Sequence, residues 1–193
     1  MDTLGALVKI VPFAFASGVN LYATVAVVGL CARYGLVSLP EQFRGLDHPV
    51  VIGIALAMYL VEFVADKIPW LDTAWDAVHT LVRPVGGAVV AVAALGDAQP
   101  VMQGLAALLG GSVALTTHVT KAGTRAVANT SPEPFTNWGL SLAEDLFVVG
   151  LTWFAVEHPI AAATVTIVLL IANVAAASWI VGAARRRFAR PAP

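Results

Sequence analysis

Long apolar stretches separated by short polar ones form the dominant pattern along this chain. Apolar residues run from about 4 to 33, 50 to 66, 135 to 156 and 160 to 182, with two shorter runs at 85–95 and 101–115. About 20 mostly apolar residues cross the hydrocarbon core of a bilayer as an α-helix. The pattern predicts an all-α integral membrane protein with about six membrane segments. The two short middle runs are compatible with thin spans or with a re-entrant hairpin.

The polar breaks add detail to this plan. The first apolar run has possible break points at Pro12 and at 17–20, because Pro removes a backbone donor and Gly adds flexibility. Stretches 70–83 and 116–129 carry apolar residues at helical spacing opposite a polar face, acidic in the first and basic in the second. We expect two amphipathic helices at the cytoplasmic surface, with their opposite charges close together. Paired glycines at 86–87 and 110–111 predict close helix packing.

Composition supports the membrane assignment. Hydrophobic residues make up 59% of the 193 residues, charged residues only 12%, and the mean hydropathy is +0.82. A soluble domain of this size needs more polar surface. The net charge of −1 gives no information about partners. The single Cys31 excludes a disulfide framework or a cysteine metal site within one chain. The sequence identifies no cofactor.

Basic residues predict the orientation. If each long run crosses once and the Arg-rich C-terminus is cytoplasmic, nine basic residues lie inside, with only Arg33 and Arg44 outside. The nine are Lys9, Lys67, Arg83, Lys121, Arg125, Arg185, Arg186, Arg187 and Arg190. We expect an inner-membrane protein with both termini in the cytoplasm. Residues 1–184 are predicted to form one transmembrane domain and residues 185–193 a short basic tail.

A short internal repeat suggests a two-part architecture. Pro49-Val50, followed by Gly53 and Ala55, recurs 51 residues later as Pro100-Val101, followed by Gly104 and Ala106. Internal repeats are common in transporters, which bind substrate at the interface between repeats. Four matched small or apolar positions also arise by chance, so the repeat is a hypothesis.

Several phrases carry a family resemblance. They are ASGVNLYAT at 16–24, VEFVADKIPWLD at 61–72, WDAVHT at 75–80 and PEP at 132–134. Together they resemble the bacterial multi-pass membrane proteins grouped under domain of unknown function 4126. The resemblance covers most of the chain and implies a multi-pass membrane protein. It assigns no catalytic residue that could be transferred to this sequence.

Acidic residues within or beside the apolar runs are the main candidates for chemistry. Glu62, Asp66, Glu144 and Asp145 are expensive to place near hydrocarbon, so we expect some of them to have a function. Their carboxylates suit a hard cation, and a protonated carboxyl can carry a proton through a medium of low dielectric. The alternative is that Asp66 marks the membrane interface and Glu62 is a hydrogen-bonded packing residue.

Uncharged and histidine candidates are less specific. Asn20 and Asn137 begin long spans and either line a pathway or hold helices together by hydrogen bonds. Asp76 and His79 are spaced as ligands of one metal, although the solvated face of an interfacial helix is the better explanation. The basic residues at 118–125 suit a phosphate or lipid headgroup, but the orientation rule already explains them.

These observations favour a small multi-pass transporter or channel for a cation or small solute that uses intramembrane carboxylates. The alternatives are an intramembrane or lipid-processing enzyme using Glu62, His79 and Glu144, or a non-catalytic membrane scaffold. No phosphate loop, nucleophile elbow, His-Glu-x-x-His or Cys-x-x-Cys occurs, so the common enzyme signatures are missing. We expect the lipid bilayer and further copies of the chain as partners, and no nucleic acid.

Overall fold

A computed structural model describes residues 3–39, 41–130 and 134–188, and all regular structure in these ranges is helical. The elements are α1 (Thr3–Val19), α2 (Leu21–Arg33), the 3-10 helix η1 (Glu41–Asp47), α3 (Pro49–Ala65), α4 (Pro69–Leu95), α5 (Pro100–Ala128), α6 (Pro134–Glu157) and α7 (Pro159–Phe188). The predicted all-α class is confirmed. The basic tail predicted at 185–193 lies partly at the end of α7 and partly outside the described residues.

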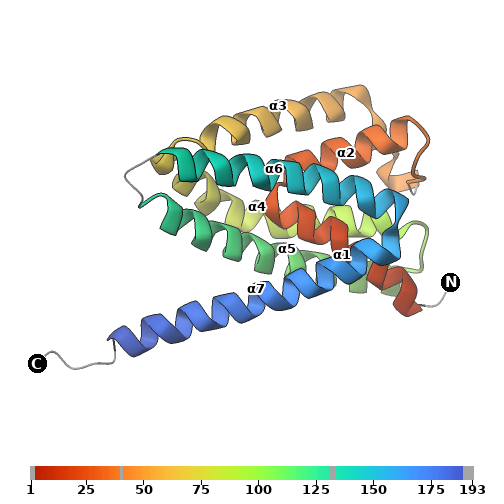
Figure 1. Cartoon of the computed structure of the whole chain (residues 1–193). Coiled ribbons are helices and arrows are strands. Elements are labelled where there is room, and N and C mark those ends of the chain that lie inside the picture. The colour runs from red at the N-terminus through yellow and green to blue at the C-terminus, as the bar shows by residue number, and fades with distance from the viewer. Residues whose placement is uncertain (1–2, 40, 131–133, 189–193) are drawn as a thin grey trace, which may run out of the picture.

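Proline sets the start of most of these helices. Each helix from α3 to α7 begins with Pro, whose fixed φ suits the first helical position and whose missing N–H would have no helical partner there. Gly96 ends α4 with a φ of 82°, a left-handed conformation that favours glycine. The chain therefore turns sharply between long helices (Figure 1).

Four described helices are long and apolar enough to cross a membrane: α4, α5, α6 and the part of α7 from Pro159 to Ala176. The two predicted amphipathic helices are not separate elements. Residues 70–83 and the apolar run 85–95 form one helix, and the run 101–115 continues without a break into 116–128. Neither polar stretch contains a residue that ends its helix. Pro84, which follows the first stretch, is accommodated inside α4. The two middle runs are thus halves of two long helices.

The first apolar run does not continue as one helix. It breaks at Asn20, whose extended backbone (φ −148°, ψ 102°) separates α1 from α2, whereas Pro12 lies inside α1. Figure 1 shows that α2 returns toward the end of the bundle where α1 began. The prediction that both termini share one side assumed a single crossing by this run. The described N- and C-terminal ends instead lie at opposite ends of the bundle (Figure 1).

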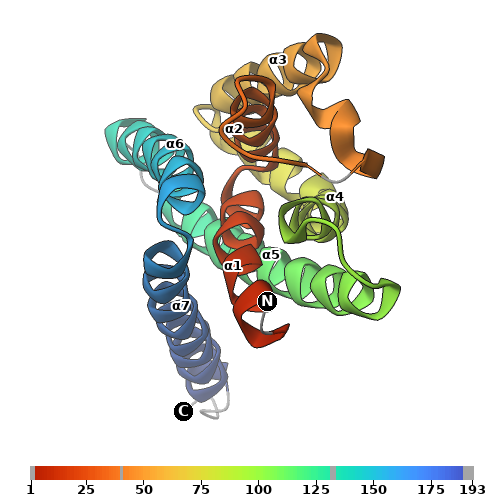
Figure 2. The same ribbon diagram turned by 90° about the vertical axis from the view of Figure 1, so that its right-hand side faces the viewer.

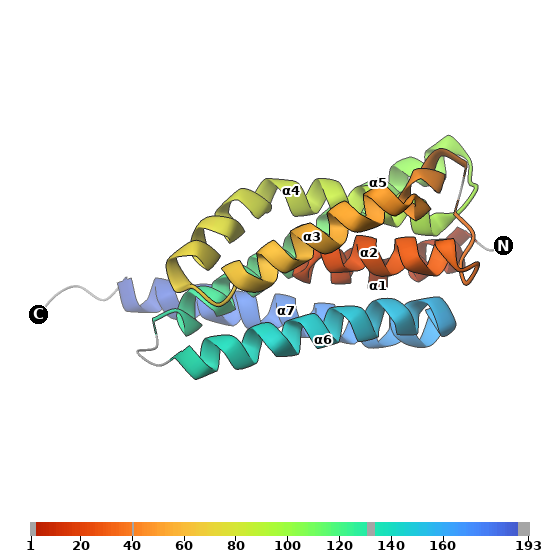
Figure 3. The same ribbon diagram turned by 90° about the horizontal axis from the view of Figure 1, so that it is seen from above.

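The broken helix α1 lies at the centre of the bundle. Figure 2 shows it between α4 and α5 on one side and α6 and α7 on the other, an arrangement also seen from above in Figure 3. Ile10, Ala14 and Ala16 of α1 are fully buried. Apolar residues on the outer helices remain exposed, including Leu60 of α3 and Ile171 of α7. An apolar outer surface is suited to contact with lipid.

Glycine allows α4 and α5 to approach closely. A Cβ atom added at Gly110 would lie 2.3 Å from the Cβ of Ala91 and 2.8 Å from the Gly87 oxygen. One added at Gly87 would lie 2.3 Å from the Cβ of Ala114. The close packing predicted for these glycines is confirmed, and it brings the polar faces of α4 and α5 together.

Candidate functional site

Charged side chains gather inside the bundle beside the break between α1 and α2. We call this set the charge network: Glu62, Asp66, Asp72, Asp76, Arg83, Lys121, Arg125, Glu144 and Asp145. All are buried except Glu144, whose side chain is 14% exposed. They come from α3, the turn after it, α4, α5 and α6. Residues distant in sequence therefore form one buried ionic site.

Arg83 occupies the middle of α4 and is fully buried. Its Nη2 donates to Glu62 Oε1 at 2.6 Å, and its Nη1 donates to the Gly18 carbonyl at 2.8 Å and to His118 Nδ1 at 2.9 Å. Because His118 Nδ1 accepts this hydrogen bond, the neutral imidazole carries its proton on Nε2, which donates to the Asp76 carbonyl at 3.0 Å. Arg83 thus links α3, α1 and α5.

Lys121 joins acids from three parts of the chain. Its Nζ lies 3.2 Å from Glu62 Oε1, 3.2 Å from Asp66 Oδ2 and 3.6 Å from Glu144 Oε2. The same ammonium donates to the Val19 carbonyl at 3.1 Å. An ammonium has three N–H donors, and Val19, Glu62 and Asp66 account for all three. Glu144 is therefore left with a purely electrostatic contact.

Arg125 closes the network toward the α3–α4 turn. Its Nε and Nη2 donate to Asp72 Oδ1 at 3.3 and 3.2 Å, its Nη2 also donates to the Asp66 carbonyl, and its Nη1 donates to the Asn137 carbonyl at 3.0 Å. Asp72 also accepts a 2.6 Å hydrogen bond from Asn129. The predicted approach of the acidic and basic stretches is confirmed at Asp72 and Arg125.

The break in the first membrane segment supplies the remaining polar groups. Its last carbonyls, Gly18 and Val19, lose the helical donors that a continuous helix would provide and accept from Arg83 and Lys121 instead. The carbonyl end of a helix also favours positive charge. Asn20 caps α2 by accepting from Ala23 N, and its amide donates to Asp145 Oδ1 at 3.2 Å.

Asn137 and Lys67 attach α6 to the α3–α4 turn. Asn137 Nδ2 donates to the Asp66 carbonyl at 3.1 Å, and Lys67 Nζ donates to Ser141 Oγ at 3.3 Å. Burial lowers the pKa of Lys67, although Asp145 and Asp66 nearby oppose the shift. All six predicted site residues (Glu62, Asp66, Glu144, Asp145, Asn20 and Asn137) therefore lie in or against one site.

Acids outnumber bases in this network. Six carboxylates, counting the half-buried Glu144, face three buried basic side chains and the half-buried Lys67, an excess of two. Glu62 Oε2, Asp66 Oδ1 and Asp145 Oδ2 are buried without a hydrogen-bond partner in the described part of the chain. Uncompensated carboxylates in low dielectric take up a proton or a cation. The excess of acids therefore favours the binding of a proton or a cation at this site.

Asp76 and His79 do not converge on a common point. His79 Nδ1 donates to the Trp75 carbonyl at 2.7 Å, so its Nε2 accepts from the Tyr22 hydroxyl at 3.0 Å. Asp76 instead lies 3.8 Å from Arg83. Across residues 3–39, 41–130 and 134–188, no group of three or more His, Cys, Asp and Glu side chains is arranged to hold a metal ion. Both ring nitrogens of His79 are thus already in use.

Sequence reasoning placed Arg83, Lys121 and Arg125 at the cytoplasmic boundary, whereas the structure buries them in the bundle. It likewise gave the acidic stretch a solvated face, although Asp72 is fully buried. A signal was present in the spacing. Positions 72, 76, 79 and 83 form one stripe along a helix, and so do 118, 121 and 125. Each stripe adjoins an apolar run on the same helix. This indicates that the polar face belongs to a membrane helix and is buried inside the bundle.

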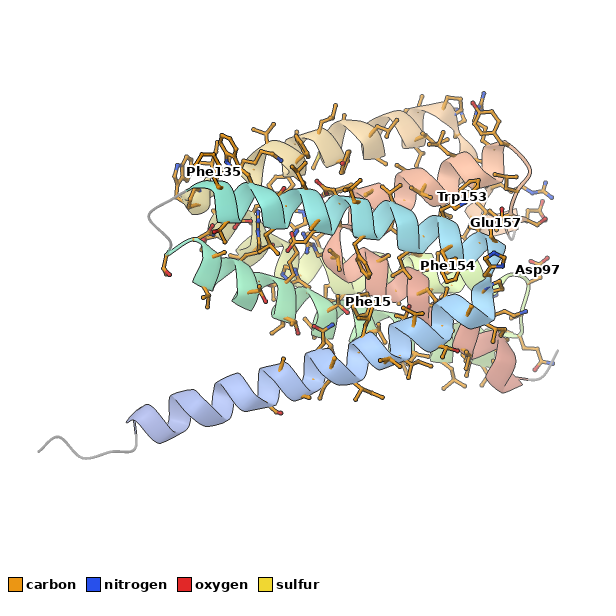
Figure 4. The ribbon with its side chains drawn as sticks, in the orientation of Figure 1. Phe15, Asp97, Phe135, Trp153, Phe154 and Glu157 are labelled. Carbon is orange, nitrogen blue, oxygen red and sulfur yellow. The ribbon has the colours of Figure 1, made fainter. Side chains whose placement is uncertain are left out.

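Two cavities reach the network from opposite faces of α5. The larger, about 280 Å³, is lined by Phe15, Val19, Thr117, Thr120, Lys121, Thr124, Ala143, Glu144, Phe147 and Asn173; we call it the α5–α6–α7 cavity. Phe15 is labelled in Figure 4. The smaller, about 160 Å³, lies between α4 and α5 and includes Asp72, Asp76 and Arg125. The charge network thus lies between two openings.

Comparisons with known proteins identify the family of this chain. No curated protein and no solved structure matches the chain. A family model matches residues 7–179, which include every residue of the charge network. The chain therefore belongs to the family described as domain of unknown function (DUF4126).

Proposed function

We propose that this protein is a small multi-pass transporter or channel for a cation or small solute, and that its intramembrane carboxylates take part in transport. The observation that carries the proposal is the excess of carboxylates over basic side chains beside the break in the first membrane segment. Ionisable residues inside a membrane are costly, and they commonly mark ion pathways and proton relays.

The broken helix adds support. Many transporters place their binding sites where a membrane helix is interrupted, because the exposed backbone carbonyls and helix ends bind ions there. Here the carbonyls of Gly18 and Val19 point at Arg83 and Lys121. Lys121 lies between Glu62, Asp66 and Glu144, where these carboxylates would otherwise bind a transported cation. We infer that this tethered ammonium substitutes for a mobile cation in the conformation described.

Orientation and assembly belong to the same proposal. We place the protein in the inner membrane with the α3–α4 turn and the C-terminal end of α7 in the cytoplasm, because Lys67 and the arginines at 185–187 follow the positive-inside rule there. Asp97 and Glu157 lie at the opposite end of the bundle from Phe135 (Figure 4). We also propose a homo-oligomer, since α7 extends away from the bundle (Figure 1) and has an apolar surface available for packing.

The enzyme alternative required an acid and a histidine in one pocket. The hydrogen bonds of His79 go to Tyr22 and Trp75, and those of Glu62 come from Arg83 and Lys121. This geometry favours transport over catalysis by Glu62 and His79. The scaffold alternative predicts no flux at all and is therefore an outcome of the experiment below.

The test is a flux screen in proteoliposomes over monovalent and divalent cations and protons. Wild-type protein is expected to carry at least one of them faster than empty liposomes, and Glu62→Gln is expected to lose this flux. Glu157→Gln is the matched control, because Glu157 is exposed at the end of α6. Variants are compared only if they elute as folded protein from size-exclusion chromatography. Wild-type flux at the level of empty liposomes would leave the scaffold in first place.

A further inference from the structure

We propose that Glu144 is the exchangeable proton-binding residue of this protein and that it takes up its proton through the α5–α6–α7 cavity. The inference rests on the proposed function in one respect: it identifies the proton as the cation that the site uses. The binding of a proton by Glu144 can nevertheless be measured whether or not the protein transports anything.

Glu144 and Asp76 are the network acids whose carboxyl groups accept no hydrogen bond in the described chain, and only Glu144 lines the larger cavity. The three donors of Lys121 are used by Val19, Glu62 and Asp66, and the donors of Arg125 go to Asp72 and to two backbone carbonyls. Glu144 Oε2 is buried and has no hydrogen-bond partner in the described chain. A buried carboxylate without a donor is poorly stabilised, whereas the neutral acid needs no counter-charge.

The larger of the two cavities gives this carboxyl a route, whereas Asp72 and Asp76 line only the smaller cavity between α4 and α5. Glu144 is the one network acid that lines the α5–α6–α7 cavity, within the part of the chain that the structure describes. The Thr117 hydroxyl lines the same cavity, is 2% exposed and has no described hydrogen-bond partner. It is therefore free to donate to or accept from a group that enters beside Glu144. By contrast, Asp145 is held by the Asn20 amide and does not line this cavity.

Both protonation states of Glu144 are accommodated. When the proton leaves as hydronium, the carboxylate that remains faces Lys121 Nζ at 3.6 Å and Arg125 Nε at 4.0 Å on α5. Asp66 beside α3 and Asp76 on α4 act on Glu144 in the opposite sense, because their negative charges favour the protonated acid. A group balanced in this way can exchange its proton without disrupting the fold.

The same surroundings disfavour a metal cation at Glu144. Lys121 and Arg125 place two positive charges within 4.0 Å of its carboxylate and would repel a further metal ion. The described residues also offer no group of three or more acidic, His or Cys ligands arranged for a metal. A proton needs a single oxygen and adds no bulk, so it is the ion that this geometry fits.

The direct test is infrared difference spectroscopy of the purified protein during a pH titration. Wild-type protein should show a protonated-carboxyl C=O band that disappears as the pH rises. Glu144→Gln should remove this band, and Glu157→Gln, the exposed control on the same helix, should retain it. If the band persists in Glu144→Gln and is lost in Asp145→Asn or Asp76→Asn, the assignment to Glu144 is overturned.

A flux assay separates this inference from the proposed function. Proteoliposomes containing a pH-sensitive dye report proton flux driven by a potassium diffusion potential. We expect flux in wild-type protein and in Glu157→Gln, and the level of empty liposomes in Glu144→Gln. A titrating Glu144 band without flux of any cation supports the proton site and refutes cation transport. Sodium or potassium flux that is unchanged in Glu144→Gln, together with an unchanged band, refutes the proton site alone.

Discussion

Replacement of Arg83 by Met tests whether the charge network is a buried structural element. The side chain is fully buried and donates to Glu62, to the Gly18 carbonyl and to His118. Methionine keeps most of the volume but none of the donors. The variant leaves Glu62 with Lys121 as its remaining cation and leaves a carbonyl and an imidazole nitrogen without a partner.

The expected magnitude follows from these losses. Removing one partner of a buried ion pair destabilises proteins by about 3 to 5 kcal/mol. For a chain of this length each kcal/mol lowers the melting temperature by about 2 to 4 °C. We therefore expect Arg83→Met to melt about 6 to 20 °C below wild type. The melting temperature of Arg83→Lys should lie between those of wild type and Arg83→Met. Lysine keeps the positive charge but lacks the planar guanidinium with which arginine donates to three acceptors.

The assay is thermal denaturation in detergent, monitored by size-exclusion chromatography of the soluble fraction. Arg44→Met is the matched control, because Arg44 is exposed on η1 and its loss should change stability by less than about 0.5 kcal/mol. Adding Glu62→Gln to Arg83→Met should recover part of the loss, since the double variant buries no unpaired acid at this point. Equal melting temperatures for Arg83→Met and Arg44→Met would refute the buried network.

Three further predictions address the packing, the broken helix and the topology. Gly110→Val should destabilise the α4–α5 contact by about 1 to 3 kcal/mol, because the added Cβ would lie 2.3 Å from the Cβ of Ala91. Gly104→Val is the control and should be tolerated, because Gly104 faces open space on the same helix. Equal melting temperatures for the two variants would contradict the close approach of α4 and α5. Asn20→Ala should lower stability by about 1 kcal/mol in the same assay through loss of the α2 cap, and Asn20→Ser should restore most of it; no change would exclude the cap. Single cysteines at Asp97, just after α4, and at Thr130, just after α5, in a background without Cys31, should react with impermeant reagent from opposite sides of the membrane. Labelling of both from one side would reject the placement of these two helix ends at opposite ends of the bundle (Figure 1).

Much of this architecture is readable from the order of the residues. The apolar runs predict helices and a membrane environment because hydrocarbon allows a backbone to span it only when its polar groups are paired internally. The break near residues 17–20 was among the predicted break points, and α3 and α6 lie within a few residues of the expected ranges. The glycines at 87 and 110 also marked the contact between α4 and α5. These features are local, so local patterns reveal them.

What the sequence by itself determined about this protein is therefore its class, its helices and its list of acidic candidates. Only the tertiary structure decided the position of Arg83, Lys121 and Arg125. A count of basic residues along the sequence places these three at the cytoplasmic boundary of the membrane. Their burial depends on acids from α3, α4 and α6 meeting them across the bundle, and on carbonyls that become available only because α1 ends at Val19. A charge in low dielectric is stable only beside its partners, and its partners here are brought close by folding alone.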